Sequence, residues 1–267
     1  MIVSKVTAAS FEMGYLRFGS GTRTLVILPG LSVQSVLPAA EQIRKQYSVF
    51  STDFTVYLFD RRDSLPPVYS PYAIADDTAE AMRTLGLRNA CVFGVSQGGM
   101  AAMALAAACP ALVQRLVLGS AAARTDAHSE AVLRTWIALA RQKDAAALYL
   151  SFVETVLPPA LFQVNRDALS AAAQSVTEGD LARFITLAES LIGFNILDKL
   201  ADIVCPVLAV GDTDDRIFGA DASREIVRRV GNQTDSEWYM YHGFGHAAYD
   251  AAPDYVHRLY AFFTQSP

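Results

Sequence analysis

The chain has 267 residues, of which 52% are hydrophobic and 18% charged, a composition that supports a sizeable buried core and is unlike that of disordered proteins. Its net charge of −5 argues against a nucleic-acid partner, which would need clustered Lys and Arg. The most apolar segment, 98–109, is too short to span a bilayer and is cut by Pro110. The first residues also lack the pattern of a secretory leader, so we expect a cytoplasmic protein with no membrane partner. The charge balance suits a small, uncharged or weakly charged partner molecule.

Three cysteines, Cys91, Cys109 and Cys205, stand in apolar surroundings, an arrangement typical of buried free thiols rather than of a disulfide or metal site. The four histidines are dispersed, and the one cluster of aspartates has no partner at metal-ligand spacing. We therefore expect no metal and no organic cofactor. The sequence leaves the oligomeric state open, a homo-oligomer included.

Short apolar runs separated by turns fill the first third of the chain. The alternating residues of 11–21 predict an antiparallel strand or hairpin arm. The β-branched and aromatic runs 24–30 and 55–60 predict strands that are buried on both faces. Residues 36–47 are expected to form a first helix, and 72–87 shows a clearer helical pattern that ends in glycine.

From Asn89 onward, strands and helices alternate regularly. A strand, a helix and a strand are predicted for "ACVFGVS", "QGGMAAMALAAACP" and "VQRLVLGSA". Later in the chain, "CPVLAVGD" and "SEWYMYHG" predict strands, while "GADASREIVRRVG" and "AAPDYVHRLYAFFTQ" predict helices. Such alternation implies a parallel sheet with helices on both faces.

Residues 121–203 interrupt this alternation. Helical patterns occur there in "SEAVLRTWIALARQ", "DAAALYLSFVETVL" and "DLARFITLAESLIG", with Pro158-Pro159 as a break and no strand pattern between them. Because the alternation resumes at Cys205, we interpret 121–203 as a helical insertion in a doubly wound sheet formed by 1–120 and 204–267.

Ser96 lies between a predicted strand and a predicted helix, inside the G-x-S-x-G pattern of Gly94 to Gly98. At a sharp strand-to-helix turn, a serine is held at strained dihedral angles and its hydroxyl projects from the sheet edge. The alternative is an ordinary glycine-rich turn. A phosphate-binding loop does not fit, because both G-x-G-x-x-G and the Lys-Ser/Thr pair are absent. We hypothesise that Ser96 is a nucleophile.

A nucleophilic serine needs a base, and His246 is the best placed of the four histidines. It lies in the glycine-rich loop "YHGFGHAAYD" after a predicted strand, at the sheet edge where the chemistry of parallel sheets gathers. His242 in the same loop is the competitor, although a local hydrogen-bonding role suits it better. His128 is expected in a solvated loop, and His257 on the last amphipathic helix.

The acid that orients the base is expected between the serine and the histidine in chain order. The loop "GDTDDRIFG" follows a predicted strand and contains Asp212, Asp214 and Asp215. We choose Asp214, three residues beyond Gly211, and keep Asp215 as the alternative.

With these motifs the chain resembles the serine-nucleophile branch of the α/β-hydrolase superfamily over nearly its whole length. The matching motifs are "LPGL", "GVSQGG", "GDTDD" and "GFGHAAYDAAPDY", in that order. The resemblance implies a doubly wound, mostly parallel eight-stranded sheet with an inserted helical cap. Two departures stand out: Pro29 replaces a common histidine, and Phe218 replaces the proline that usually follows the acid by four residues.

The resemblance also implies an oxyanion hole made by the backbone N–H groups of Leu31 and Gln97. It places the segment 121–203 over the active site as the cap. Among the aromatic residues of the cap, Trp136, Phe152 and Phe194 are the candidates for contact with substrate, against the alternative that they only pack within the cap.

The sequence thus favours a carboxylesterase-like serine hydrolase of a small ester, lactone or related carbonyl compound, with Ser96, Asp214 and His246 as catalytic triad. Acyl transfer, C–C bond hydrolysis and perhydrolysis use the same triad and remain alternatives. So does a receptor-like binding protein with little turnover. A dehalogenase or an epoxide hydrolase is disfavoured, because each would need Asp at position 96.

Overall fold

An eight-stranded sheet forms the centre of the molecule, whose computed structural model describes residues 1–232 and 235–265. The strands are β1 (Ile2–Thr7), β2 (Glu12–Phe18), β3 (Arg23–Leu28), β4 (Phe54–Arg62), β5 (Ala90–Val95), β6 (Val113–Gly119), β7 (Val207–Asp212) and β8 (Glu237–Tyr241). The helices are α1 (Ala40–Gln46), α2 (Pro71–Thr84), α3 (Gln97–Ala108), α4 (Ala127–Arg141), α5 (Ala145–Val156), α6 (Pro159–Ala173), α7 (Glu178–Glu189), α8 (Ala222–Val227), α9 (Ala248–Ala251) and α10 (Tyr255–Thr264).

The strand order in the sheet is β1-β2-β4-β3-β5-β6-β7-β8. β1 pairs with β2 and β2 with β4 in antiparallel fashion, and every later pairing is parallel. This arrangement confirms the predicted mostly parallel, eight-stranded α/β sheet. The N-terminal strand β1 was not among the predicted elements, because its residues are largely exposed and carry little apolar patterning.

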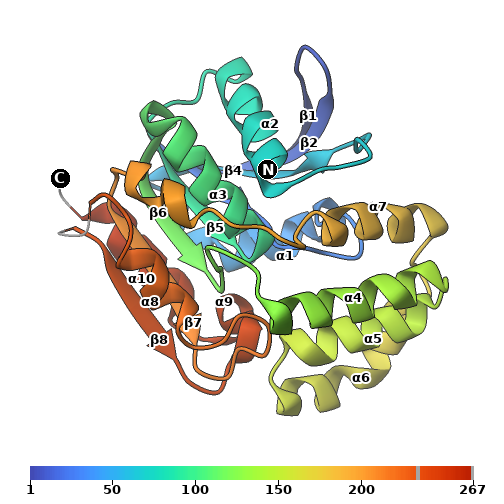
Figure 1. Ribbon diagram of the computed structural model, residues 1–267. Coiled ribbons are helices and arrows are strands. Elements are labelled where there is room, and N and C mark those ends of the chain that lie inside the picture. Colours follow the sequence, from blue (N-terminus) through green and yellow to red (C-terminus); the bar gives the residue numbers. More distant parts are fainter. Residues whose placement is uncertain (233–234, 266–267) are drawn as a thin grey trace.

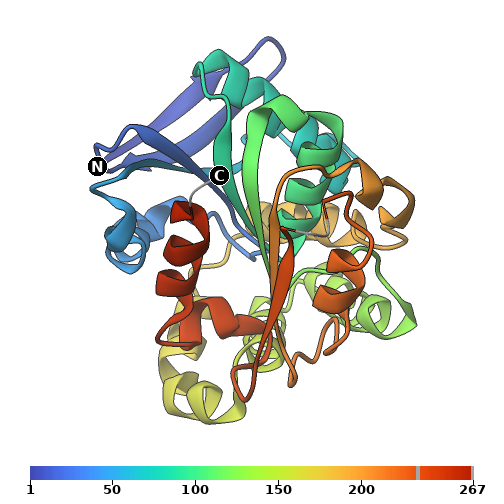
Figure 2. The ribbon, with the colours of Figure 1, turned by 90° about the vertical axis from the view of Figure 1, so that its left-hand side faces the viewer.

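Helices cover both faces of the sheet, as Figure 2 shows with the strands seen nearly edge-on. One hydrophobic cluster joins residues of α2 and α3 to the sheet, and a second cluster joins α1 and α10 to the other face. All six residues of β5, and likewise all six of β7, are therefore buried. Burial on both faces explains why these strands read as continuous apolar runs instead of alternating.

The helical insert, α4–α7, lies between β6 and β7 in the chain and gathers at one side of the molecule (Figure 1). Three of its helices match the prediction, but α6 was missed because Pro158-Pro159 was interpreted as a break. Pro159 instead occupies the first turn of α6, where a missing backbone N–H costs nothing. Within the described residues, no helix is long and apolar enough to cross a membrane. The exact limits of the insert, 121 and 203, stay a prediction.

The first turn of α3 lies directly against the end of β3. A Cβ atom added at Gly98 would lie 2.1 Å from the backbone oxygen of Leu28, and one added at Gly94 would lie 2.5 Å from the backbone oxygen of Gly98. Real Cβ atoms do not approach backbone this closely, so a side chain at either position would force the helix away from the sheet. Gly98 therefore sets the distance between α3 and β3, and Gly94 sets the distance between α3 and β5.

This contact predicts that Gly98→Ala destabilises the protein by about 1–3 kcal/mol, the usual cost of overpacking a core. The measurement is thermal or urea unfolding of purified protein. Gly179→Ala is the matched control, because an added Cβ there meets only the Thr177 hydroxyl oxygen, at 3.6 Å. Equal stability of the Gly98 variant and the parent protein would contradict the close contact.

Candidate active site

Ser96 occupies the turn between β5 and α3 with φ +50° and ψ −117°, backbone angles that a residue with a side chain rarely adopts. Such a conformation costs about 1–3 kcal/mol and persists only where the surrounding structure enforces it. Here the Ser96 N–H donates to the Gly119 carbonyl at 2.9 Å, and its own carbonyl accepts from the Met100 N–H at 3.0 Å. The Ser96 side chain is half-buried and reaches a cavity. This is the strand–turn–helix geometry that the sequence motif requires.

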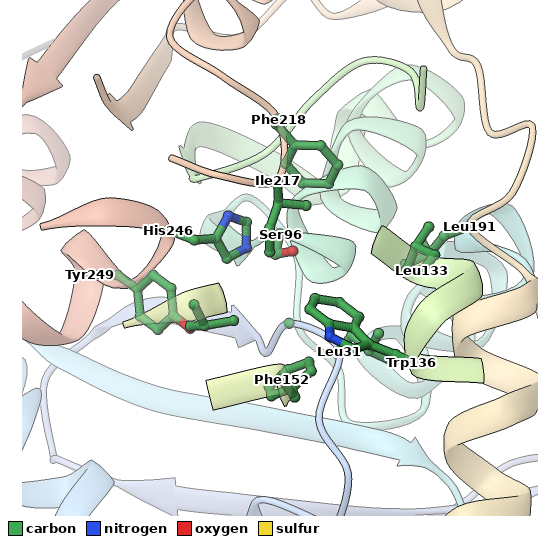
Figure 3. Close-up of a pocket in the computed structure, with 12 residues that line it drawn as sticks. Leu31, Ser96, Leu133, Trp136, Phe152, Leu191, Ile217, Phe218, His246 and Tyr249 are labelled. Carbon is green, nitrogen blue, oxygen red and sulfur yellow. The ribbon is translucent and has the colours of Figure 1, made fainter. Parts of the chain in front are cut away.

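His246 lines the same cavity from the loop after β8 (Figure 3). Positive φ angles at Gly243 (+83°) and Gly245 (+62°) let the loop turn sharply enough to present it. The His246 side chain is only 3% exposed, and its Nδ1 lies 2.9 Å from Oδ2 of Asp215. Since an ionised carboxylate only accepts hydrogen bonds, Nδ1 carries the proton and Nε2 is left as an acceptor.

The acid beside His246 is Asp215, which corrects the choice of Asp214 made from the sequence. Asp214 points elsewhere, and its Oδ2 accepts the Gly243 N–H at 2.7 Å. The fully buried Asp212 explains the difference, because its two carboxylate oxygens accept the N–H groups of Asp214 and Phe244, at 2.7 and 2.9 Å. These two hydrogen bonds fix the turn of the chain after β7. As a result Asp215, the residue after Asp214, faces His246.

The charge of the Asp215 carboxylate is favoured by its neighbours. Burial on its own raises the pKa of this carboxyl, but electrostatic attraction to the His246 ring and the hydrogen bond from it lower the pKa. The backbone N–H groups of Ile217 and Phe218 also donate to Asp215, at 2.8 and 3.2 Å. The net result is a pKa below the ordinary value, so Asp215 is ionised at neutral pH.

The other three histidines lie apart from the Ser96 cavity. His242 is exposed, and its Nδ1 lies 3.1 Å from the Thr213 hydroxyl, the local hydrogen bond expected for it. His128 is exposed as well, with Nε2 2.9 Å from the Arg216 carbonyl oxygen. His257 lies exposed on α10.

The cavity around Ser96 is narrow, with a volume of about 20 Å³, and mostly apolar. Trp136 and Phe152, two of the candidates for contact with substrate, line it, with ring centroids 4.8 Å apart. Phe194 lies elsewhere, 5.6 Å from the ring of Tyr72. Sequence reasoning missed several apolar lining residues that come from the insert and from the two loops carrying Asp215 and His246: Leu133, Val156, Leu191, Ile217, Phe218 and Tyr249.

Phe218 shows why these lining residues were missed. Its ring centroid lies 5.5 Å from that of His246, so it forms part of the wall that excludes water from the histidine. In the sequence it appeared only as a departure from a family pattern. An apolar residue two or three positions beyond the acid was the one available indication that this loop folds over the cavity.

The loop after β3 passes directly beside Ser96. A Cβ at Gly30 would lie 3.3 Å from Cβ of Ser96, and both Gly30 and Leu31 line the cavity. Gln97 is the first residue of α3, so its backbone N–H is among those with no acceptor inside the helix. The backbones of Leu31 and Gln97 therefore approach Ser96 from two sides.

A buried arginine forms hydrogen bonds to the loop after β3. Arg61, at the end of β4, is 4% exposed, and its Nη2 donates to the carbonyl oxygens of Pro29 and Gly30, at 2.7 and 3.4 Å, and to Oε1 of Gln97 at 3.1 Å. Burial lowers the pKa of Arg61 to about 10, which leaves it charged at neutral pH. A second arginine, Arg183 of α7, pairs at 2.8 Å with Oδ1 of the buried Asp60.

The insert is attached to the core at the same place. The Gln97 side chain is fully buried and its Nε2 donates to the Leu187 carbonyl of α7 at 2.9 Å. Together with the Asp60–Arg183 pair, this contact connects α7 to the turn that carries Ser96.

The described residues contain no group of three or more His, Cys, Asp or Glu that could hold a metal ion. All three cysteines are free, as predicted. Cys91 is buried, whereas Cys109 and Cys205 are half-buried. Burial raises the pKa of the Cys91 and Cys205 thiols to about 11, which keeps them protonated and unreactive.

A family model described as "alpha/beta hydrolase fold" matches residues 23–253. The chain belongs to this α/β-hydrolase family. It is 28% identical over 236 residues to a protein of Caulobacter sp. (strain K31) named "Putative carbamate hydrolase RutD", a match that covers 84% of this chain and 85% of that relative.

Solved structures share the whole fold of this α/β-fold hydrolase. MGS-M2, an α/β hydrolase from a Medee basin deep-sea metagenome library, superimposes with a TM-score of 0.87 at 19% identity, covering 99% of this chain and 98% of the other. The enol-lactonase from Burkholderia xenovorans LB400 superimposes with a TM-score of 0.83 at 19% identity, covering 98% and 100%. At these identities the likeness shows a common fold.

The lowered pKa of Asp215 predicts a pH-dependent contribution to stability. A carboxyl group whose pKa is lower in the folded than in the unfolded protein stabilises the fold above its unfolded value, about 3.9, and loses this effect as the pH falls through its folded value. The difference in melting temperature between the parent protein and Asp215→Asn should therefore be largest above about pH 4 and shrink in more acidic buffer. Asp198→Asn, at an exposed aspartate, is the control. A difference that stays constant between neutral and strongly acidic pH would contradict the prediction.

Proposed function

We propose that this protein is a serine hydrolase of small esters or lactones with an uncharged acyl group, with Ser96 as nucleophile, His246 as base and Asp215 as the acid that orients the base. The observation that carries the proposal is the strained backbone of Ser96 in the cavity that His246 lines, with Asp215 at 2.9 Å from His246. Strain of this kind is found where function needs a side chain presented in one direction. Asp214 takes no part in this proposal.

The chemistry follows from the protonation states. Nε2 of His246 takes the proton of the Ser96 hydroxyl as the oxygen attacks the substrate carbonyl carbon. The same proton then passes to the leaving oxygen as its bond to the carbonyl carbon breaks, which leaves an acyl group on Ser96. A water molecule, deprotonated by His246, then attacks that acyl group. The bond between the acyl carbon and the Ser96 oxygen breaks, the proton on His246 passes to that oxygen, and the carboxylic acid is released. The Asp215 carboxylate stabilises the imidazolium in both steps.

The backbone N–H groups of Leu31 and Gln97 are the proposed donors to the oxyanion. Arg61 supports this assignment at Leu31, because the peptide between Gly30 and Leu31 is trans and its C=O and N–H point in opposite directions. With the Gly30 carbonyl held toward Arg61, the Leu31 N–H is directed away from Arg61 and toward the side on which Ser96 lies. Arg61 is thus a positioning residue for the oxyanion hole.

The cavity indicates the substrate class. Its lining contains no Lys or Arg among the described residues, so nothing there compensates a negative charge on the substrate beside Ser96. Its volume of about 20 Å³ favours an acyl group of acetyl size. The enol-lactonase neighbour acts on an ester bond in a ring, the same functional group.

Carbamate hydrolysis is the second candidate, because the chain matches the Caulobacter relative along most of its length. A free carbamate is an anion, which the apolar lining accommodates poorly. The segment 121–203 is proposed to act as a cap that supplies Trp136 and Phe152 to the substrate site.

Ser96→Ala should lower kcat for p-nitrophenyl acetate by at least about 10³-fold, because the acyl group then has no attachment point. Asp215→Asn should lower kcat by up to about 10⁴-fold, because the amide favours the wrong histidine tautomer. Asp214→Asn is the matched control and should stay within a few-fold of the parent protein. Ammonium carbamate, with release of carbon dioxide measured instead of p-nitrophenol, tests the second candidate. Full activity of Ser96→Ala on the ester would overturn the proposal.

Arg61→Met should lower kcat by about 10–100-fold with little change in KM, since it frees the peptide that bears one oxyanion donor. A trifluoromethyl ketone, which forms a tetrahedral adduct, should lose affinity in parallel, whereas a product carboxylic acid should not. Arg62→Met is the control, because Arg62 contacts Asp77 and the Ser10 carbonyl instead of the loop. An Arg61→Met protein with a lower melting temperature but unchanged kcat would reduce Arg61 to a structural role.

A further inference from the structure

A second, larger chamber adjoins the catalytic cavity. Gly30, Leu31, Phe152 and Tyr249 line both, so the two spaces meet at these residues. The chamber has a volume of about 480 Å³, and its other walls come from the loop after β3, from α1 and from α5. It opens to solvent at exposed residues, and Ser35 is one of them.

The chamber carries a single negative charge. Asp250 is the only charged residue among those described that line it. Its Oδ1 accepts a hydrogen bond at 2.8 Å from Nε2 of Gln46, which also donates to the Tyr249 carbonyl at 3.1 Å. Asp250 is solvent-exposed at the edge of the chamber, and no Lys or Arg of the described residues forms an ion pair with it. A cation in the chamber would therefore be attracted to a carboxylate that has no basic partner.

Four aromatic side chains line the same chamber: Tyr47, Tyr149, Phe152 and Tyr249. Figure 3 shows two of them, Phe152 and Tyr249, where they line the cavity of Ser96 and His246. Aromatic faces attract cations, and quaternary ammonium groups are bound in proteins by several rings together. The combination of aromatic rings with one carboxylate and no basic residue suits an organic cation better than a sugar, a phosphate or a hydrocarbon chain.

We propose that this chamber binds the alcohol portion of the substrate and selects alcohols that carry a quaternary or protonated amine. The inference rests on the proposed ester hydrolysis, since it assigns the chamber to the leaving group. The narrow cavity beyond Ser96 holds the acyl group that stays on the serine. The alcohol has to depart first, and the larger chamber, which meets the cavity at Leu31, Phe152 and Tyr249, is the adjoining space with room for it.

Two acetate esters of equal shape test the charge preference: acetylcholine and 3,3-dimethylbutyl acetate, in which carbon replaces the quaternary nitrogen. The parent protein should hydrolyse acetylcholine with a kcat/KM about tenfold higher, mainly through a lower KM. Asp250→Asn, which keeps the hydrogen bond to Gln46, should bring the ratio of the two esters close to one. Glu41→Gln removes the same charge from α1 outside the chamber and should keep the ratio.

Binding to the Ser96→Ala variant separates this inference from the proposed function. Calorimetry should show tighter binding of acetylcholine than of the neutral ester, and a second change, Asp250→Asn, should remove the difference. If neither ester is turned over by the parent protein but acetylcholine still binds preferentially through Asp250, the proposed function fails and the chamber assignment stands. Equal binding and equal kcat/KM for the two esters would overturn the assignment, as would an unchanged ratio in Asp250→Asn.

Discussion

The packing of the first turn of α3 against the end of β3 sets the geometry on which the rest of the candidate site depends. Gly98 brings the helix backbone so close to the Leu28 carbonyl that a side chain would not fit between them. The chain must then turn within one residue. Ser96 makes this turn by adopting a φ angle of +50°. The cost of about 1–3 kcal/mol is offset by α3 itself, because its residues 97–106 are all buried. The same packing places Gly30 against the Ser96 side chain.

Buried charged groups hold the loop beside Ser96. Asp60 accepts from the backbone N–H of Arg61, from the Arg183 guanidinium and from the Ser35 hydroxyl. The Arg61 guanidinium also interacts electrostatically with Asp60, while its hydrogen bonds go to the carbonyls of the loop. A negative charge that develops at the Leu31 N–H would be stabilised by this arrangement, since charges in a buried site are screened less than in water. The insert takes part through Arg183, so its position and that of the loop are coupled.

The local patterns of the sequence predicted most of the fold, because most helices and strands lie in a single environment, such as burial on both faces, that their own residue pattern reflects. Strands β5 and β7 are buried on both faces and read as apolar runs, and the glycine pattern around Ser96 reports a backbone contact that only glycine permits. The prediction failed where tertiary contacts decide. Helix α6 begins at a proline that looked like a break, and β1 is held at the sheet edge by pairing with β2 more than by its own apolar residues.

The choice between Asp214 and Asp215 could not be made from spacing alone. Both follow β7, and both carboxylates have partners in the loop after β8: Asp214 bonds to the Gly243 backbone and Asp215 to the His246 ring. Which one faces the histidine depends on Asp212, whose carboxylate bonds to both loops and so fixes the turn. Sequence spacing gives the order of the acids but not the direction of each side chain after a tight turn.

The larger chamber beside the Ser96 cavity could not be predicted from the sequence, because its walls come from segments that are distant in the chain. Tyr47, Tyr149 and Tyr249 belong to three different elements, and only Tyr249 stands in one of the motifs recognised in the sequence, beside Asp250. That motif does not indicate that Tyr47 and Tyr149 lie near Asp250; only the fold brings these side chains together. Opposite charges then lie on the two sides of the site: Arg61 behind the loop that borders Ser96, and Asp250 in the chamber that the same loop borders. A substrate whose carbonyl becomes negative during the reaction and whose alcohol is positive would be oriented by both charges at once.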